Sequence, residues 1–214
     1  MPYKIGYIDE QAGERIDFAN LMDDDDDNIE VVFFEVDEHT VISNLLEEVL
    51  NSDIECLVVD YHLSETGVPF EGSDLIGLFH RIRPNFPKII YTAKEDKVIP
   101  EVENEIIYFI NDKSIKSDEK RSEDFRMKLK TLINNYYEDI DEAKQNLIEL
   151  TTERKKRDLT IEEENLLFKS KKFLLKMDTR KRELPEVIHN LDYISELKEA
   201  NLKADEILNK IRNA

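Results

Sequence analysis

The stretch Leu57-Val58-Val59-Asp60 limits what this chain can fold into more than any other part of the sequence. Three consecutive apolar residues, two of them β-branched, are typical of a strand that is buried on both faces of a parallel sheet. Asp60 then falls at the end of that strand, at the edge where open α/β sheets hold their ligands. Taken alone, an aspartate after a strand is an ordinary turn residue, so its interpretation depends on the rest of the chain.

Further strand-like runs and helical patterns alternate through the first half of the chain. The other expected strands are residues 3–8, 30–36, 88–91 and 106–110. The expected helices are residues 12–22, a helix beginning at Asp37 or Thr40, one beginning at Ser73 or Asp74, and a weak one at 98–105. In residues 12–22 we expect Ile16, Ala19 and Met22 to share one side. This alternation predicts a five-stranded, parallel, doubly wound α/β domain over residues 1–125.

The pattern changes near Asp118, and all five glycines precede residue 78. Apolar residues then recur three or four positions apart, at Leu129, Leu132, Tyr136, Ile140, Ala143, Leu147 and Leu150. This seven-residue repeat predicts a long helix with a coiled-coil-like seam. Thr160 with Glu163 forms a capping-box sequence that opens a second helix, and Pro185 opens a third. We therefore expect residues 126–214 to form an all-α helical hairpin or bundle that serves as an output or interaction region.

Charge is distributed unevenly. Residues 1–118 carry 9 basic and 28 acidic residues, whereas residues 119–214 carry 21 of each. The acidic half argues against nucleic-acid binding there, because phosphate neutralisation needs Lys and Arg, but it is compatible with a divalent cation. Basic clusters in the second half are more typical of solvated helix faces than of a nucleic-acid site.

The sequence also indicates a compartment. We find no apolar run of membrane-spanning length and no signal peptide, and we expect no membrane segment. Cys56, the single cysteine, lies within the apolar run before Asp60 and fits a reducing environment. We therefore expect a cytoplasmic protein.

Polar residues follow the expected strands in a specific order. Asp9 and Glu10 follow the first, Asp60 ends the third, Thr92 follows the fourth and Lys113 follows the fifth. Right-handed crossovers would bring all five to one edge of the sheet. This set closely resembles the CheY-like receiver domain of bacterial two-component response regulators, over about residues 1–125. The resemblance implies a flavodoxin-like fold and a phosphorelay signalling role instead of an enzyme activity.

The chemistry of that role needs these residue types. An aspartate can attack a phosphoryl group and become an aspartyl phosphate, which the resemblance assigns to Asp60. Carboxylates suit Mg²⁺, so Asp9, Glu10 and Asp60 are expected ligands, and the resemblance adds the backbone carbonyl of His62. Lys113 offers a positive charge, and Thr92 a hydroxyl donor, to the phosphoryl oxygens.

The sequence departs from the family pattern at several positions. Ser114 and Ser64 stand where the family usually has proline, and Ile110 stands where it has its switch aromatic. Gly72 matches the family's glycine before the third helix only if the loop after Asp60 carries roughly four extra residues. The longer loop could restrict which kinase docks.

Two alternatives to the leading hypothesis stay open. The first is a degenerate receiver that acts as a phosphorylation-independent adaptor, which the departures favour and the intact carboxylates oppose. The second is a magnesium-dependent phosphohydrolase, although His62 occupies the position where such enzymes generally have a second acid. For the leading hypothesis, the expected partners are a histidine kinase or phosphotransfer protein, an effector that binds the C-terminal helices, and a second copy of the chain in a homodimer.

Overall fold

The computed structural model describes residues 2–23, 28–92 and 110–177 of the chain. It divides into two compact units, residues 1–140 and residues 141–214. Within the described residues, no helix is both long and apolar enough to cross a bilayer. The predicted helix at 98–105, residues 106–109 of the predicted fifth strand and the helix opened by Pro185 lie outside the described residues.

The first unit is built on a parallel sheet of five strands, in the order β2-β1-β3-β4-β5. The strands are β1 (Tyr3–Ile8), β2 (Ile29–Phe34), β3 (Cys56–Asp60), β4 (Lys88–Thr92) and β5 (Ile110–Asp112). Every residue of β3 and of β4 is buried, and for β3 this confirms the prediction of a strand covered on both faces. The fold is therefore the predicted parallel α/β architecture.

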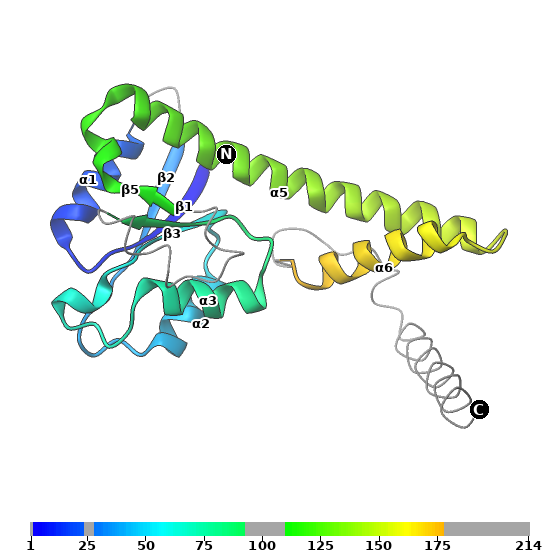
Figure 1. The fold of residues 1–214 in the computed structure, drawn as a ribbon, viewed down its shortest axis with the longest axis horizontal. Coiled ribbons are helices and arrows are strands. Elements are labelled where there is room, and N and C mark those ends of the chain that lie inside the picture. The colour runs from blue at the N-terminus through cyan, green and yellow to red at the C-terminus, as the bar shows by residue number, and fades with distance from the viewer. Residues whose placement is uncertain (1, 24–27, 93–109, 178–214) are drawn as a thin grey trace, which may run out of the picture. The chain divides into compact units, whose positions relative to one another are not determined.

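Helices cover both faces of this sheet, as Figure 1 shows. α1 (Ala12–Met22) and the first part of α5 (Glu119–Arg154) lie on one face, and α2 (Ile42–Asn51) and α3 (Gly72–Ile82) lie on the other. The core on the α1 and α5 face is formed by buried residues from both helices, from three strands and from the turn at Ile115. They are Ile5, Tyr7, Phe18, Leu21, Met22, Cys56, Val58, Ile89, Tyr91, Ile115, Phe125, Leu129 and Ile133.

Several element boundaries differ from the sequence prediction. β5 is described only from Ile110, and it runs on to Asp112. α3 is capped by Glu71, and Asp74 supplies the reciprocal bond of a capping box, so neither Ser73 nor Asp74 is the cap. α2 starts at Ile42, because Asp37 and Thr40 hydrogen-bond to each other in the preceding turn.

The buried side of α1 also differs from the prediction. Ile16 is 63% exposed, whereas Phe18, Leu21 and Met22 are buried. The reason is a tertiary contact: the Phe18 ring stacks on that of Tyr7, with 3.9 Å between centroids. That stacking turns the Phe18 side of the helix toward the sheet and leaves Ile16 in solvent.

α5 is a single helix of 36 residues that runs from the first unit into the second. Two positions of the predicted seam, Leu132 and Leu150, are only partly buried. The other five are buried: Leu129, Tyr136, Ile140, Ala143 and Leu147. Ile133 is buried where Leu132 was predicted. Leu129 and Ile133 join the core under the sheet, and Tyr136 packs on Phe86, so the first compact unit extends past the expected boundary at residue 125.

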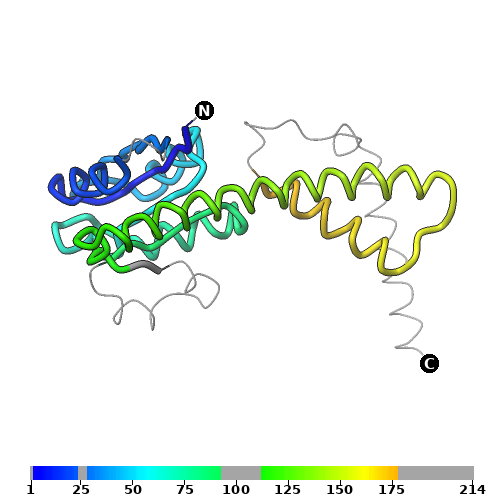
Figure 2. The backbone as a smooth tube through the Cα atoms, turned by 90° about the horizontal axis from the view of Figure 1, so that it is seen from above, coloured from blue at the N-terminus to red at the C-terminus, as the bar shows by residue number. Residues whose placement is uncertain are grey.

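The described part of the second unit consists of the end of α5 and α6 (Ile161–Leu175). The predicted capping box opens α6: the Thr160 N–H donates to Glu163 Oε2 at 2.8 Å, and the Glu163 N–H donates to Thr160 Oγ1 at 3.3 Å. Figure 2 shows α6 running back beside the end of α5 as an antiparallel hairpin.

Candidate functional site

The site lies at the carboxyl edge of the sheet and begins with Asp9, directly after β1. Asp9 is fully buried. Its Oδ2 accepts hydrogen bonds from the Tyr7 hydroxyl and from Lys113 Nζ, both at 2.7 Å, and its Oδ1 accepts from the Gln11 N–H at 2.8 Å. These three donors fix the orientation of the buried Asp9 carboxyl group.

Asp60, the last residue of β3, is the second buried carboxylate. Its Oδ2 accepts from the His62 N–H at 2.8 Å, and its Oδ1 lies 2.7 Å from Lys113 Nζ. Burial raises the pKa of Asp60 above its usual value, and the ammonium of Lys113 opposes that rise. Asp60 is therefore held at the strand end, as predicted, with one oxygen on the backbone and the other on Lys113.

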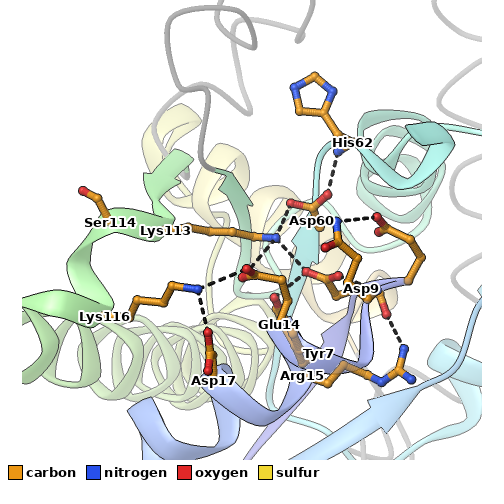
Figure 3. Close-up of polar contacts among 12 residues, drawn as sticks. Tyr7, Asp9, Glu14, Arg15, Asp17, Asp60, His62, Lys113, Ser114 and Lys116 are labelled. Carbon is orange, nitrogen blue, oxygen red and sulfur yellow. Dashed lines mark hydrogen bonds and ion pairs between the residues drawn. The ribbon is translucent and has the colours of Figure 1, made fainter. Parts of the chain in front are cut away.

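Lys113 joins these two carboxylates, as Figure 3 shows. It is the first residue of the short helix η3 (Lys113–Ser117) and is 7% exposed. Burial alone would lower the pKa of Lys113, but attraction by Asp60 and then by Asp9 outweighs it and raises the pKa above 10.5. The three residues thus form a buried cluster with two negative charges and one positive charge.

Glu10 lies beside this cluster and is half-buried. Its Oε1 accepts a hydrogen bond from the Gln11 side chain at 3.1 Å. Its Oε2 is buried and has no hydrogen-bond partner among the described residues. Burial raises the pKa of this carboxyl group, and the hydrogen bond from the Gln11 side chain opposes that rise without cancelling it.

Thr92 is fully buried at the end of β4. In the sheet register Asp60 lies beside Tyr91, and Thr92 lies beside Asp112 of β5. Thr92 therefore lies one residue beyond the level of Asp60, on the neighbouring strand.

The turn after β5 is fixed by Asp112. Its carboxylate accepts from the Ser114 N–H at 2.8 Å and from the Ser114 hydroxyl at 2.6 Å. Ser114, one of the positions at which the sequence departs from the receiver-domain pattern, therefore has a structural role next to Lys113.

The long loop after Asp60 is an ordered element that closes back on the site. It contains the short helix η1 (Leu63–Thr66), which Gly67 ends in the left-handed region at φ 100°. The Ser64 hydroxyl donates to the Glu71 carboxylate at the far end of the loop. A Cβ on Gly72 would lie 1.8 Å from the backbone oxygen of Asp60, so only glycine allows α3 to start this close to the site.

Sequence analysis missed several residues of the site. Tyr7 precedes Asp9 by two positions, and the period of a strand could have placed it on the same side. Glu14 of α1 lies 3.6 Å from Lys113 Nζ and 3.0 Å from Lys116 Nζ, and Asp17 pairs with Lys116 at 2.7 Å. No sequence signal indicated these last contacts, because they depend on how α1 packs beside η3.

The donor chemistry of the edge suits a hard cation, but the side chains are not grouped around a metal position. Among the described residues, no three His, Cys, Asp or Glu side chains converge in a way that could hold a metal ion. Lys113 engages both Asp9 and Asp60 instead. The unpartnered Oε2 of Glu10 and the all-oxygen donor set fit Mg²⁺. The His62 carbonyl accepts from the Glu65 N–H at 3.3 Å and keeps a second lone pair.

No protein-family model and no curated protein matches this sequence. Among solved structures, the chain is similar to a response regulator receiver domain protein (CheY-like) from Methanospirillum hungatei JF-1. The two are 17% identical and superpose with a TM-score of 0.48, over 64% of this chain and 98% of that one.

Proposed function

We propose that the first unit is a phosphoacceptor receiver and that Asp60 takes the phosphoryl group. The observation that carries this proposal is the buried ammonium of Lys113, 2.7 Å from a carboxylate oxygen of Asp60 and 2.7 Å from one of Asp9. An ion pair that only stabilises the fold needs one carboxylate beside the lysine. A second buried carboxylate at the ligand-binding edge of a parallel sheet is costly to stability and indicates a chemical role.

In the proposed reaction, an oxygen of Asp60 forms a bond to the phosphorus of a phosphohistidine on a kinase or phosphotransfer protein. The P–N bond breaks, and the imidazole leaves with the electron pair and takes up a proton from solvent. Lys113, already at Asp60, meets the negative oxygens of the transferred group, and the Thr92 hydroxyl donates to the same oxygens. The protein is thus a substrate of the kinase and not itself an enzyme.

Mg²⁺ is the cofactor that we infer for this step. Asp9, Glu10, Asp60 and the His62 carbonyl would hold it. When bound, it would supply positive charge that neutralises the phosphoryl oxygens. Bound Mg²⁺ would give the buried Oε2 of Glu10 a partner, which this atom lacks among the described residues.

We further infer that the phosphoryl group is the signal and that the helical region passes it to a protein effector in the cytoplasm. The added group carries about −1.5 to −2 charges at a site that Lys113 shares with Asp9 and, at longer range, Glu14. A shift of Lys113 would pull on η3, from which α5 begins two residues later.

A phosphorylation-independent adaptor is the second candidate. The Asp112–Ser114 contacts favour it, because they fix the turn beside Lys113 by hydrogen bonds within the chain. The experiment below separates the two candidates, because an adaptor needs no phosphoryl group. The phosphohydrolase alternative has less support: position 62 carries an imidazole in place of a second carboxylic acid, and the His62 ring points away from Asp60 (Figure 3).

The test is phosphorylation by a small phosphodonor with and without Mg²⁺, followed by intact-mass measurement. We expect one phosphoryl group on the wild type with Mg²⁺, little when EDTA is present, and none on Asp60→Asn. Asp53→Asn is the matched control, because it removes an exposed aspartate outside the site and should leave labelling unchanged. Labelling that persists in Asp60→Asn, or a wild type that stays unlabelled, would overturn the proposal.

A further inference from the structure

One side of α6 carries large apolar side chains in solvent. Ile161 is 77% exposed, Phe168 52% and Leu175 55%. The three are spaced seven residues apart, and an α-helix drifts by only about 20° per seven residues, so they form one straight stripe along α6. We refer to these three residues as the α6 stripe.

The α6 stripe is not the side of α6 that the fold covers. The buried residues of the helix are Leu167, Ser170 and Leu174. At 3.6 residues per turn, their side of the helix lies about 130° around from the stripe. Burial against the described residues therefore does not account for the stripe, and large apolar side chains aligned along the exposed side of a helix suit a contact with another helix.

The stripe is symmetric about its middle residue. Ile161 lies seven positions before Phe168, and Leu175 lies seven positions after it. If two copies of α6 run antiparallel about a two-fold axis at Phe168, Ile161 meets the partner's Leu175 and the two phenylalanines meet each other. Such a pairing is isologous, because the same patch on each copy covers the other.

The charges beside the stripe suit the same arrangement. The first turn of α6 is acidic, with Glu162, Glu163 and Glu164, and its second half carries Lys169, Lys171 and Lys172. On one flank of the stripe, the antiparallel pairing places Glu164 beside the partner's Lys171, and symmetry repeats this pair. A parallel pairing would set like charges against each other, so the charge pattern favours the antiparallel arrangement.

We propose that α6 is a homodimerisation surface, in which two copies of this chain pair antiparallel through Ile161, Phe168 and Leu175. The proposal goes beyond the phosphoacceptor function, because pairing through α6 needs no phosphoryl group on Asp60. A helix of 15 residues is only about 22 Å long, so the interface is small and the dimer should dissociate in the micromolar range.

The first test measures the mass of the full-length protein by analytical ultracentrifugation over a series of concentrations. We expect a monomer–dimer equilibrium that Asp60→Asn does not change and that Phe168→Glu shifts at least tenfold toward monomer. Circular dichroism shows whether the Phe168→Glu chain keeps its helices. A protein that stays monomeric at every concentration overturns the proposal and assigns the stripe to another occupant, such as residues 178–214 of the same chain.

The second test is a charge exchange that reports the register. Glu164→Lys alone and Lys171→Glu alone should each weaken the dimer severalfold, because each sets like charges together twice. The double variant should recover the wild-type equilibrium, although Glu164 also lies 3.5 Å from Arg154 within the chain. Lys169→Glu is the matched control, since it makes the same charge change away from the stripe. Absence of recovery in the double variant contradicts the antiparallel register.

Cysteine cross-linking decides the orientation directly, because the native Cys56 is buried and unavailable. Phe168→Cys should cross-link to its own copy under mild oxidation. Ile161→Cys should cross-link only when mixed with Leu175→Cys. Efficient cross-linking of Ile161→Cys on its own would indicate a parallel pair and overturn the proposed geometry.

Discussion

In the first unit, apolar residues from both helices and strands meet under a sheet, whereas the described part of the second unit is a single helical hairpin. The sheet unit buries its central strands on every side. The hairpin buries only one side of α6 and leaves Ile161, Phe168 and Leu175 exposed. A parallel sheet with helices on both faces closes its core within one chain, but two helices have too few neighbours to do so.

The two units also differ in what they bury besides apolar side chains. Among the described residues, the buried charged groups all belong to the first unit: Asp9, Asp60, Lys88, Lys113 and Arg126. The buried polar residue of the second unit is Ser170, which is uncharged. Burying a charge is costly unless it is paired, so charge in the interior indicates chemistry, and exposed apolar surface indicates contact.

The largest expected effect tests this contrast with the same substitution in each unit. Leu129 is fully buried and Leu175 is 55% exposed, and both are helical leucines. Leu129→Ala should lower the free energy of unfolding by about 2–5 kcal/mol, because it leaves a cavity in the core. Leu175→Ala should change it by less than about 0.5 kcal/mol at concentrations where the chain is monomeric. Urea denaturation measures both, and similar losses in the two variants would contradict the contrast.

A smaller effect concerns Lys88, which is buried at the start of β4, where its Nζ donates to the carbonyl oxygens of Pro84 and Phe86. Burial lowers the pKa of Lys88 to about 8 from 10.5. At pH values between these two pKa values, Lys88 binds a proton in the unfolded chain but not in the folded chain. The contribution of Lys88 to stability should therefore rise with pH through this window, by about 3 kcal/mol for a difference of about 2.5 pKa units at 1.36 kcal/mol per unit.

The measurement is the difference in unfolding free energy between the wild type and Lys88→Met, at several pH values from 7.5 to 10. Taking the difference removes the titration of groups that both chains share and that do not interact with Lys88. We expect the difference to rise in favour of the wild type as the pH increases. A difference that is flat, or that falls, would show that Lys88 stays charged in the folded protein.

The smallest effect tests how locally the second unit is organised. Thr160→Ala removes the acceptor for the Glu163 N–H and should destabilise the start of α6 by about 1 kcal/mol. Hydrogen exchange should accelerate in the first turn of α6 and stay unchanged in β3 and β4. Thr160→Ser keeps the hydroxyl and should behave as the wild type. Faster exchange in the sheet strands would mean that the two units unfold together.

Much of the site could be predicted from the sequence, because parallel strands bring their carboxyl ends to one edge. That rule placed Asp9, Asp60 and Lys113 within contact distance, although they are far apart along the chain. The start of α6 was also predictable, since the Thr160–Glu163 capping box is a local interaction.

Other features depend on packing between segments and left no local signal. The buried side of α1 is set by stacking of Phe18 on Tyr7, and the contacts of Glu14 with Lys113 and Lys116 require α1 to lie beside η3. The structural need for glycine at position 72 comes from the backbone of Asp60, twelve residues earlier. The sequence by itself therefore determined which residues meet at the sheet edge, through chain periodicity and strand direction. Only the tertiary structure decided which atoms pair there, because pairing depends on distances of a few ångströms between segments that periodicity does not define.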